Sequence, residues 1–303
     1  MQADWTEPIK SILPAALRER VLRYAGSAPV EEIRIRCGRP VQLVYAQGEE
    51  LLPYVATADD CALLLERISE HSVYAFEEEL KSCYITIRGG CRVGLCGRVR
   101  GEGERRRLTD AAGVNIRIAR ECTGCADGVA PALTEHGRPQ STLIFSAPGV
   151  GKTTMLRDIA RQFSYGLNGI TPRRVCIADE RGELAGAYLG RPTLDVGPRT
   201  DVMDGCKKAD AMRIMVRVMS PEIIITDELG GVEDAEAALD AAASGVAVIA
   251  SAHAASIEEL ISRSGVARCV SDGLFRRFVW LTRERGRVDA KIIGAEDIGL
   301  CGR

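Results

Sequence analysis

The stretch SAPGVGKTT, Ser146 to Thr154, decides the fold of this 303-residue chain. It follows the apolar run Thr142–Phe145, which indicates a strand, and leads into Lys152–Gln162, which has the composition of a helix. A glycine-rich loop ending in Gly-Lys-Thr between a strand and a helix is typical of a phosphate-binding loop. Ser146 stands where the pattern usually has Gly, but that position chiefly needs a small residue. We therefore predict a phosphate-binding loop, the alternative being an accidental Gly-Lys-Thr in an ordinary turn.

The loop also predicts which atoms would hold a nucleotide. Backbone N–H groups of Gly149, Val150 and Gly151, together with the N-terminus of the following helix, can surround phosphate oxygens. The Lys152 ammonium can reach the β and γ phosphates, and the Thr153 hydroxyl can coordinate Mg²⁺. The predicted nucleotide-binding residues are Ser146, Pro148, Gly149, Val150, Gly151, Lys152, Thr153 and Thr154.

A second acidic element follows a later apolar run, in EIIITDELG. Nucleotide chemistry needs an acid at a strand end to hold Mg²⁺, and Asp227 is in that position. Glu228, the next residue, could polarise the attacking water. We therefore predict Thr153 and Asp227 as metal ligands and Glu228 as a catalytic residue. A plain polar cap on the end of a strand is the alternative.

Two further polar groups follow apolar runs. In DERGE, the side chains of Asp179, Glu180 and Glu183 could lie near the γ-phosphate and its water, while Arg181 could face a neighbouring subunit. His253, in IASAHA, could sense the γ-phosphate. Charges on a surface loop and a histidine that caps a strand are the alternatives, and spacing does not choose between them.

The chain around these motifs alternates between strands and helices. Apolar runs bounded by helices indicate a parallel sheet covered on both faces, which is an α/β fold. The expected strands are TLIF, RVCIAD, EIIITD and VAVIAS; the expected helices are Lys152–Gln162, Lys207–Met219 and Asp234–Ala243, with a loop after RVCIAD and a closing hairpin in RFVWLTRERGRVDAKIIGA.

The amino-terminal part has a mixed pattern that predicts a smaller α+β domain over residues 1–133, with the nucleotide domain over 134–303. Helices are expected over Pro14–Tyr24 and Asp59–Ser69. Hairpins are expected in EEIRIRCGRPVQLVY and across Gly89 and Gly90. The stretch Glu121–Gln140, rich in Gly, Pro and small residues, is the expected linker.

Composition excludes some classes of protein. The net charge of -2 and pI near 6.1 argue against a surface built to bind nucleic acid or anionic lipid. The stretch Ala241–Ala254 is too short to span a bilayer, so we expect no transmembrane segment and only peripheral association, through partner proteins. Eleven cysteines without a recognisable signal peptide favour reduced thiols in the cytoplasm. Cys122 and Cys125 form a CxxC with no second pair at zinc spacing, which disfavours a metal site.

Taken together, the motifs resemble a known family. The resemblance runs from Glu31 to His253 and rests on EIRIRCGRP, SVYAFEEEL, YITIRGGCRVGLCGRV, SAPGVGKTTMLRDIAR, IADERGELAG, the segment from DVGPRTDVMDG to IIITDELG, and SGVAVIASAH. The chain is similar to the stage III sporulation protein AA family of sporulation ATPases, which itself resembles the hexameric type II and type IV secretion ATPases. The departures are Ser146 and Ala147, where the family more often has Gly and Pro.

The resemblance implies a RecA-like P-loop ATPase domain with a mostly parallel central sheet, preceded by a smaller α+β domain. It implies Mg²⁺-dependent ATP hydrolysis by a homo-oligomer, expected to be a hexameric ring. It also implies a role in powering or assembling a channel between mother cell and forespore, with membrane-embedded channel proteins as partners.

The same resemblance implies roles for individual residues. In secretion ATPases an acidic box lies between the two nucleotide motifs and a histidine box follows the second, and DERGE and SAH occupy those places. This favours catalytic roles for Asp179, Glu180, Glu183 and His253. Ring assembly would place arginines across the interface; the candidates are Arg92, Arg98, Arg199 and Arg217, with Arg217 included among the expected catalytic residues. Solvated surface charge is the alternative for each arginine.

Two other functions compete with a hydrolase. A nucleic-acid motor is disfavoured, because single-strand binding uses stacking aromatics along a basic groove and only 5% of residues are aromatic. A switch or scaffold that binds ATP without significant turnover is disfavoured by Glu228, because a scaffold needs no acid to polarise water.

Overall fold

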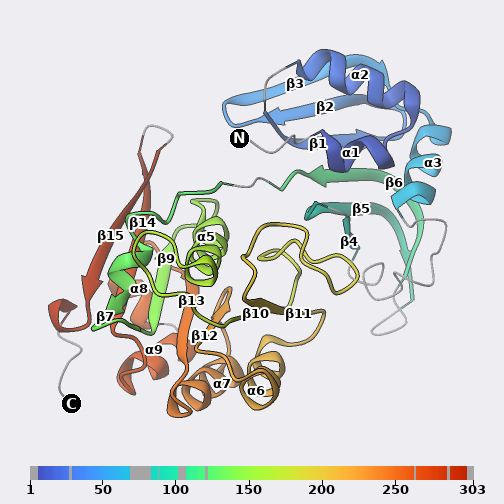
Figure 1. Cartoon of the computed structure of the whole chain (residues 1–303). Coiled ribbons are helices and arrows are strands. Elements are labelled where there is room, and N and C mark those ends of the chain that lie inside the picture. The colour runs from blue at the N-terminus through green and yellow to red at the C-terminus, as the bar shows by residue number, and fades with distance from the viewer. Residues whose placement is uncertain are drawn as a thin grey trace. The chain divides into compact units, whose positions relative to one another are not determined.

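The computed structural model describes residues 6–26, 29–68, 83–87, 89–101, 107–119, 122–262, 264–284 and 287–298 (Figure 1). The chain divides into two compact units, Met1–Glu121 and Cys122–Arg303. The stretch SVYAFEEEL, Ser72 to Leu80, contributed to the resemblance but lies outside the described residues.

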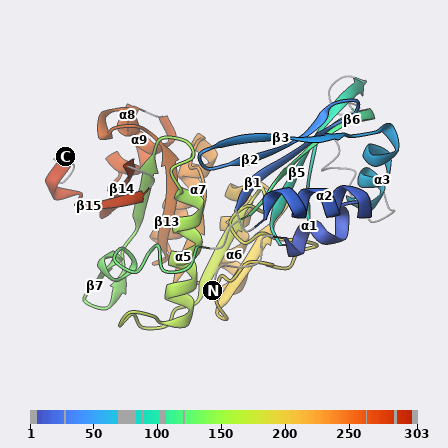
Figure 2. The same ribbon diagram turned by 90° about the horizontal axis from the view of Figure 1, so that it is seen from above.

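The first unit is built on an antiparallel sheet with the strand order β3-β2-β1-β6-β5-β4. Figure 2 shows β3, β2 and β1 side by side with α1 and α2 along them. The elements are α1 (Glu7–Ile12), α2 (Ala15–Ala25), β1 (Val30–Arg36), β2 (Pro40–Tyr45), β3 (Gly48–Val55), α3 (Ala58–Ile68), β4 (Tyr84–Ile87), β5 (Cys91–Arg100) and β6 (Arg107–Arg117).

Local sequence patterns explain several of these elements. Ile33 and Ile35 alternate with Arg34 and are fully buried in β1, as a half-buried strand requires. Gly89 and Gly90 both have positive φ, which allows the tight turn that joins β4 to β5. The expected helices and hairpins are confirmed. Strands β3 and β6 were not predicted. The sequence of β6 is rich in Ala, Gly and polar residues and shows no apolar run, and the strand forms by pairing with β1.

The second unit is built on a sheet with the strand order β11-β10-β12-β13-β9-β14-β15, parallel except for the last pair. Counted along the chain from β9, the first five strands lie in the order 3-2-4-5-1. The strands are β7 (Thr134–Glu135), β8 (Arg138–Pro139), β9 (Thr142–Ser146), β10 (Val175–Asp179), β11 (Thr200–Asp204), β12 (Ile223–Thr226), β13 (Ala247–His253), β14 (Arg277–Glu284) and β15 (Arg287–Gly294).

Helices cover both faces of this sheet, as predicted. α5 packs on one face through Leu156, Ile159 and Phe163, whereas α6, α7 and α9 share a core with Phe145 and Ile224 on the other face. The helices are η3 (Ala130–Leu133), α5 (Lys152–Tyr165), α6 (Lys208–Met219), α7 (Val232–Ala243), α8 (Ile257–Ser262), α9 (Ser264–Ser271) and η4 (Glu296–Ile298). The mostly parallel α/β fold and the separate amino-terminal sheet are therefore confirmed.

Two details differ from the expectation. The segment after β10 was predicted as a loop but contains β11, whose polar sequence TDVMD lies at the edge of the sheet and gives no apolar run. The division between the units lies at the start of the predicted linker and not at Leu133. The reason is that Ala126, Val129 and Leu133 are buried in the same core as α5.

Within the part of the chain that the structure describes, no helix has both the length and the apolar composition needed to cross a membrane.

Candidate active site

The parallel pairing brings the predicted motifs to one edge of the seven-stranded sheet. His253 is in register with Ser146, and Thr226 is in register with both Ala178 and Ala250. The residues that follow these strand ends therefore emerge side by side, as expected for the carboxyl ends of parallel strands. This edge, called the carboxyl edge below, carries the phosphate-binding loop, the acidic pair Asp227 and Glu228, the DERGE segment and His253.

The loop between β9 and α5 has the backbone that phosphate binding requires. Gly149 has φ +75° and Gly151 has φ +124°, conformations that residues with a Cβ rarely adopt. No heavy atom lies within 4 Å of a Cβ placed on Gly149, so its need for glycine is conformational and not a matter of space. Ala147, Pro148 and Gly149 are exposed. An exposed glycine-rich loop at a helix N-terminus fits an anionic ligand.

Lys152, the first residue of α5, is buried, with 6% of its surface exposed. Its Nζ donates to the Ser146 carbonyl (3.2 Å), the Ser146 hydroxyl (3.2 Å) and the Ala147 carbonyl (3.3 Å). The same Nζ lies 2.8 Å from Nδ1 of His253. The Ser146 hydroxyl thus supplies an acceptor that the usual Gly would lack, and the ammonium is directed back into the mouth of the loop.

His253 links this lysine to the acid predicted to act on water. Because an ammonium only donates, Nδ1 of His253 accepts from Lys152, and the ring proton sits on Nε2. Nε2 contacts Oε1 of Glu228, and Nη1 of Arg181 lies 3.6 Å from its Oε2. Lys152, His253, Glu228 and Arg181 therefore form a continuous chain of alternating donors and acceptors.

The backbone fixes Glu228 in an uncommon conformation. Its φ is +32°, in a region that non-glycine residues rarely occupy. Its N–H donates to the Ser251 hydroxyl (3.1 Å), and the next N–H, of Leu229, donates to the Ser251 carbonyl (2.8 Å). Residues held in such conformations concentrate at functional sites, where surrounding contacts offset the strain.

Asp227 is buried, and its charge is matched by a residue that sequence reasoning missed. Lys208, at the start of α6, donates to the Asp227 carboxylate (3.2 Å), the Asp227 carbonyl (2.8 Å) and the Glu228 carbonyl (3.0 Å). The sequence placed a helix at this lysine but gave the residue no role. The only signal was a lysine at the start of a helix, where the helix dipole disfavours a cation.

Asp179 is the last residue of β10 and lies in the interior of the carboxyl edge. Asp179 is fully buried, and its two oxygens accept from the N–H groups of Leu184 (3.1 Å) and Ala185 (2.8 Å). Burial, and secondarily the charge of Asp227, raises the pKa of Asp179 to about 6 despite these hydrogen bonds. These two hydrogen bonds hold the DERGE segment against the end of β10.

The other residues of DERGE connect that segment to its neighbours. The exposed Glu180 accepts from the Lys208 backbone N–H (3.3 Å) at the start of α6. The backbone carbonyls of Glu183 and Leu184 accept from the Arg157 guanidinium on α5. The DERGE segment thus contacts α5, α6 and Glu228. Its contact with the Glu228 carboxylate is made by Arg181.

The donor set fits Mg²⁺. Thr153 is half-buried in the first turn of α5, and Asp227 follows β12, so the set offers a hydroxyl and a carboxylate. Magnesium prefers such hard oxygen ligands and keeps several waters. The Lys208 ammonium compensates the Asp227 carboxylate in this structure.

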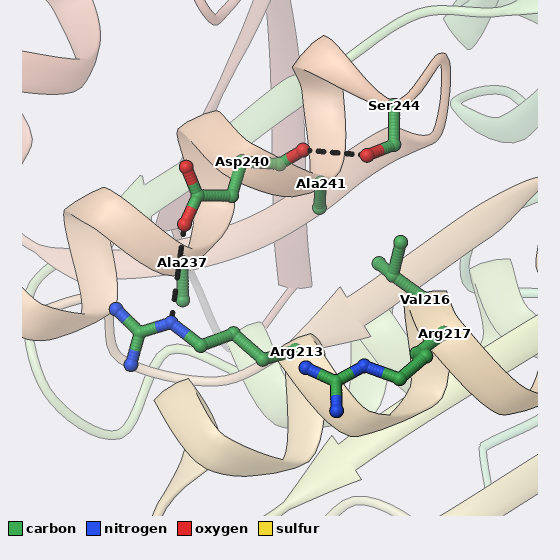
Figure 3. A pocket seen from close by; sticks show the side chains of 7 residues that line it. All are labelled: Arg213, Val216, Arg217, Ala237, Asp240, Ala241 and Ser244. Carbon is green, nitrogen blue, oxygen red and sulfur yellow. Dashed lines mark hydrogen bonds and ion pairs between the residues drawn. The ribbon is translucent and has the colours of Figure 1, made fainter.

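Arg217 lies away from this cluster. It occupies the last turn of α6, whereas Lys208 opens that helix, roughly 14 Å away at 1.5 Å rise per residue. Figure 3 shows it in a pocket between α6 and α7, lined by Arg213, Val216, Arg217, Ala237, Asp240, Ala241 and Ser244. In that pocket Arg213 lies 3.9 Å from the Asp240 carboxylate. The structure therefore does not bring Arg217 to the carboxyl edge of its own chain.

The other candidate arginines also have local contacts. Arg199 precedes β11, at the opposite edge of the sheet, and donates to the Ser164 carbonyl (2.8 Å) at the end of α5. Arg92 stacks on the Tyr84 ring, 3.8 Å from its centroid. Arg98 lies in β5 and carries an exposed side chain.

Comparison with known proteins gives consistent results. Residues 3–297 match the family described as sporulation stage III, protein AA. The chain is 46% identical over 281 residues to the stage III sporulation protein AA of Bacillus subtilis, covering 92% of this chain and 91% of that protein.

The fold is similar to those of solved ATPases. The ATPase DotB of Legionella pneumophila matches with a TM-score of 0.63 at 17% identity, covering 95% of this chain and 84% of DotB. The pilus retraction motor PilT, solved with bound ADP, matches with a TM-score of 0.57 at 18% identity, covering 91% and 82%. These matches confirm the expected fold class of secretion-type ATPases.

Proposed function

The chain belongs to the sporulation stage III protein AA family, and on that premise we propose that it binds MgATP at the carboxyl edge and hydrolyses it. The observation that carries the proposal is the meeting of Lys152, Asp227, Glu228 and His253 at one sheet edge, from three segments far apart in sequence. The similarity to PilT and DotB supports the same class of activity.

The roles follow from the chemistry of each side chain. The N–H groups of Gly149, Val150 and Gly151 hold phosphate oxygens, and Lys152 exchanges the Ser146 and Ala147 carbonyls for the β and γ phosphates. Pro148 and Thr154 line the same loop. Thr153 and Asp227 would hold Mg²⁺, which supplies neutralisation of phosphate charge when bound.

Glu228 orients the attacking water and accepts its proton. His253 touches both Lys152 and Glu228, so it is positioned to respond when Lys152 moves onto the γ-phosphate. Glu180 and Glu183 act through the loop that carries Arg181. In the isolated chain, Glu228 is engaged by His253 and Arg181, so these contacts must rearrange before it can act on water.

An assembled state would supply the missing positive charge. We propose a homo-oligomer, expected as a hexameric ring, in which an exposed arginine such as Arg217 reaches a neighbouring subunit's nucleotide. The partners we propose are membrane-embedded channel proteins between mother cell and forespore, with the ATPase in the cytoplasm or peripheral at the membrane through them. Nucleic acid is not proposed as a partner.

A paired lysine substitution tests the proposal. Lys152→Ala removes the phosphate-binding ammonium, while Lys207→Ala removes an exposed lysine from the same edge. We expect Lys152→Ala to lower phosphate release by about a hundredfold or more, and Lys207→Ala to leave it nearly unchanged. Equal phosphate release from Lys152→Ala and wild type would refute hydrolysis at this site.

A further inference from the structure

The CxxC turn that precedes α5 holds two thiols in contact. Cys122 is exposed and Cys125 is half-buried, and their side chains share a hydrogen bond. Gly124, between them, has φ +86°, which bends the chain so that the two side chains approach. Two cysteines three residues apart in such a turn have the spacing of dithiol redox motifs.

The turn is fixed firmly to α5. The Cys125 thiol donates to the Thr154 carbonyl (3.7 Å) in the first turn of that helix. The Ala126 N–H donates to the buried Asp158 carboxylate (2.8 Å), which also accepts from Arg161 and Gln162. The position of Cys125 is therefore set by the fold, while Cys122 remains open to reagents.

A metal site does not account for this pair. Among the residues that the structure describes, no group of three or more His, Cys, Asp or Glu side chains could hold a metal ion. Two thiolates alone are too few ligands for a structural zinc, which takes four. What remains for two adjacent thiols, one exposed and one fixed, is thiol–disulfide exchange.

We propose that Cys122 and Cys125 form a thiol–disulfide exchange site that takes low-molecular-weight disulfides as its oxidants. The Cys122 thiolate attacks the disulfide RSSR, forming a mixed disulfide and releasing one RS⁻. The Cys125 sulfur then attacks the Cys122 sulfur, closing the intramolecular disulfide and releasing the second RS⁻. The two thiol protons leave to the released thiolates, so the dithiol and RSSR become a disulfide and two RSH.

The two cysteines have different roles in this sequence. Burial, followed by the charges of Asp158 and Cys122, raises the pKa of Cys125 to about 12. Cys125 is thus a poor first nucleophile, and it attacks only a sulfur already held beside it. Once Cys122 is in a mixed disulfide, the charge of its thiolate no longer contributes to raising the pKa of Cys125.

Oxidation also changes the contact with α5. A disulfide sulfur has no hydrogen to donate, so the bond from Cys125 to the Thr154 carbonyl is lost when the disulfide closes. The site therefore sits against the helix that begins at Lys152, and its redox state alters one contact in the first turn of that helix.

Mass spectrometry of the full-length native protein tests the proposal without any variant. After incubation with oxidised glutathione and blocking of free thiols, trypsin releases residues 121–152, because it does not cleave between Arg138 and Pro139, and this peptide contains Cys122 and Cys125 as its only cysteines. We expect this peptide to lose two hydrogens through an internal disulfide. The buried Cys176, in the peptide 175–181, is the control and should react at least about tenfold less, because exchange requires access.

Two variants separate the roles. Cys125→Ser should accumulate a glutathione adduct on Cys122, whereas Cys122→Ser should leave Cys125 largely unmodified. Absence of the internal disulfide in wild type while Cys122 carries the adduct would overturn the proposal. Equal adduct formation on both single variants would overturn the assigned roles. Return of the peptide to the dithiol form with reduced glutathione is the expected sign of reversible exchange.

Discussion

At the amino edge of the seven-stranded sheet, Arg173 and Arg174 both contact Glu222, whereas at the carboxyl edge Asp179 and Asp227 lie near each other with like charge. The shorter of these two ion pairs, called the amino-edge pair, joins the Arg173 guanidinium to the Glu222 carboxylate at 2.7 Å. Both arginines are paired with the Glu222 carboxylate. We interpret this cluster as structural, because it joins the segment before β10 to the segment before β12.

The carboxyl edge shows the opposite balance. Its charges are more deeply buried, its acids repel one another, and Glu228 has an uncommon backbone conformation. The Lys152 ammonium donates to the Ser146 and Ala147 carbonyls and to the Ser146 hydroxyl, and it lies beside Nδ1 of His253. The buried charges of the carboxyl edge surround the loop to which we assign phosphate binding, whereas Arg173, Arg174 and Glu222 at the amino edge pair with one another. Anionic phosphates and a cation would complete the carboxyl edge.

Replacing one acid at each edge should give the largest contrast. We expect Asp227→Asn to lower MgATP turnover by about a thousandfold, because the variant loses the carboxylate that would hold the metal. Glu222→Gln should change turnover by less than about twofold, since it alters only a structural pair. Phosphate-release assays on both variants measure this difference. Similar losses of turnover in the two variants would contradict a catalytic role that is confined to the carboxyl edge.

Breaking the buried pair at the carboxyl edge should cost the most stability. Lys208→Met leaves Asp227 buried without its cation and should lower the free energy of unfolding by about 3 kcal/mol. Arg173→Met, at the more exposed amino-edge pair, should cost about 1 kcal/mol. Urea unfolding followed by Trp280 fluorescence reports on this unit, in a Trp5→Phe background that removes the other tryptophan. Equal costs would show that burial does not distinguish the pairs.

The pH dependence of Asp179 is the next smaller effect. Its pKa rises from 3.8 when unfolded to about 6 in the fold, so the native state binds the proton more tightly. Its stabilising contribution is present below pH 3.8 and is lost as the pH rises through 6, by about 3 kcal/mol at most. Asp179→Asn should flatten this decline between pH 4 and pH 6 in urea titrations. An unchanged slope would contradict the burial of this carboxyl.

Glu222 should show the smallest effect, with the opposite sign. Burial alone would raise the pKa of Glu222, but hydrogen bonds from the Arg174 N–H and the Arg173 side chain lower it below 4.5. Its contribution is therefore present above pH 4.5 and lost as the pH falls. The stability difference between wild type and Glu222→Gln should be about 1 kcal/mol at pH 7 and vanish in acid. If Asp179 and Glu222 changed the free energy of unfolding in the same direction with pH, the opposite pKa shifts of the two carboxyls would be contradicted.

The sequence predicted those features of the fold and the site that depend on residues close together in the chain. The glycine spacing from Gly149 to Lys152 and the apolar run of β12 are set by neighbouring residues, so the fold class and the sheet edge were predicted. Strand β11 and the pairing partner of Asp227 were not, because edge pairing and long-range ion pairs leave no local pattern.

Burial was the main quantity that spacing could not give. DERGE shows three acids near one another, but only the fold shows that Asp179 is enclosed while Glu180 is exposed. In the same way, a serine at position 146 was interpreted as merely small, whereas its hydroxyl accepts from Lys152. The family resemblance supplied the order of the motifs, and the three-dimensional contacts showed which of their side chains are enclosed and which are exposed.

Hydrolysis at the carboxyl edge is tested most directly by measuring phosphate release from MgATP over a range of protein concentrations, for wild type and Glu228→Gln. We expect the specific activity of wild type to rise with protein concentration, because subunits complete one another's sites, and we expect the variant to bind ATP without hydrolysing it. If both proteins bind ATP and neither releases phosphate at any concentration, or if both release it equally, the carboxyl edge is not the hydrolytic site described here.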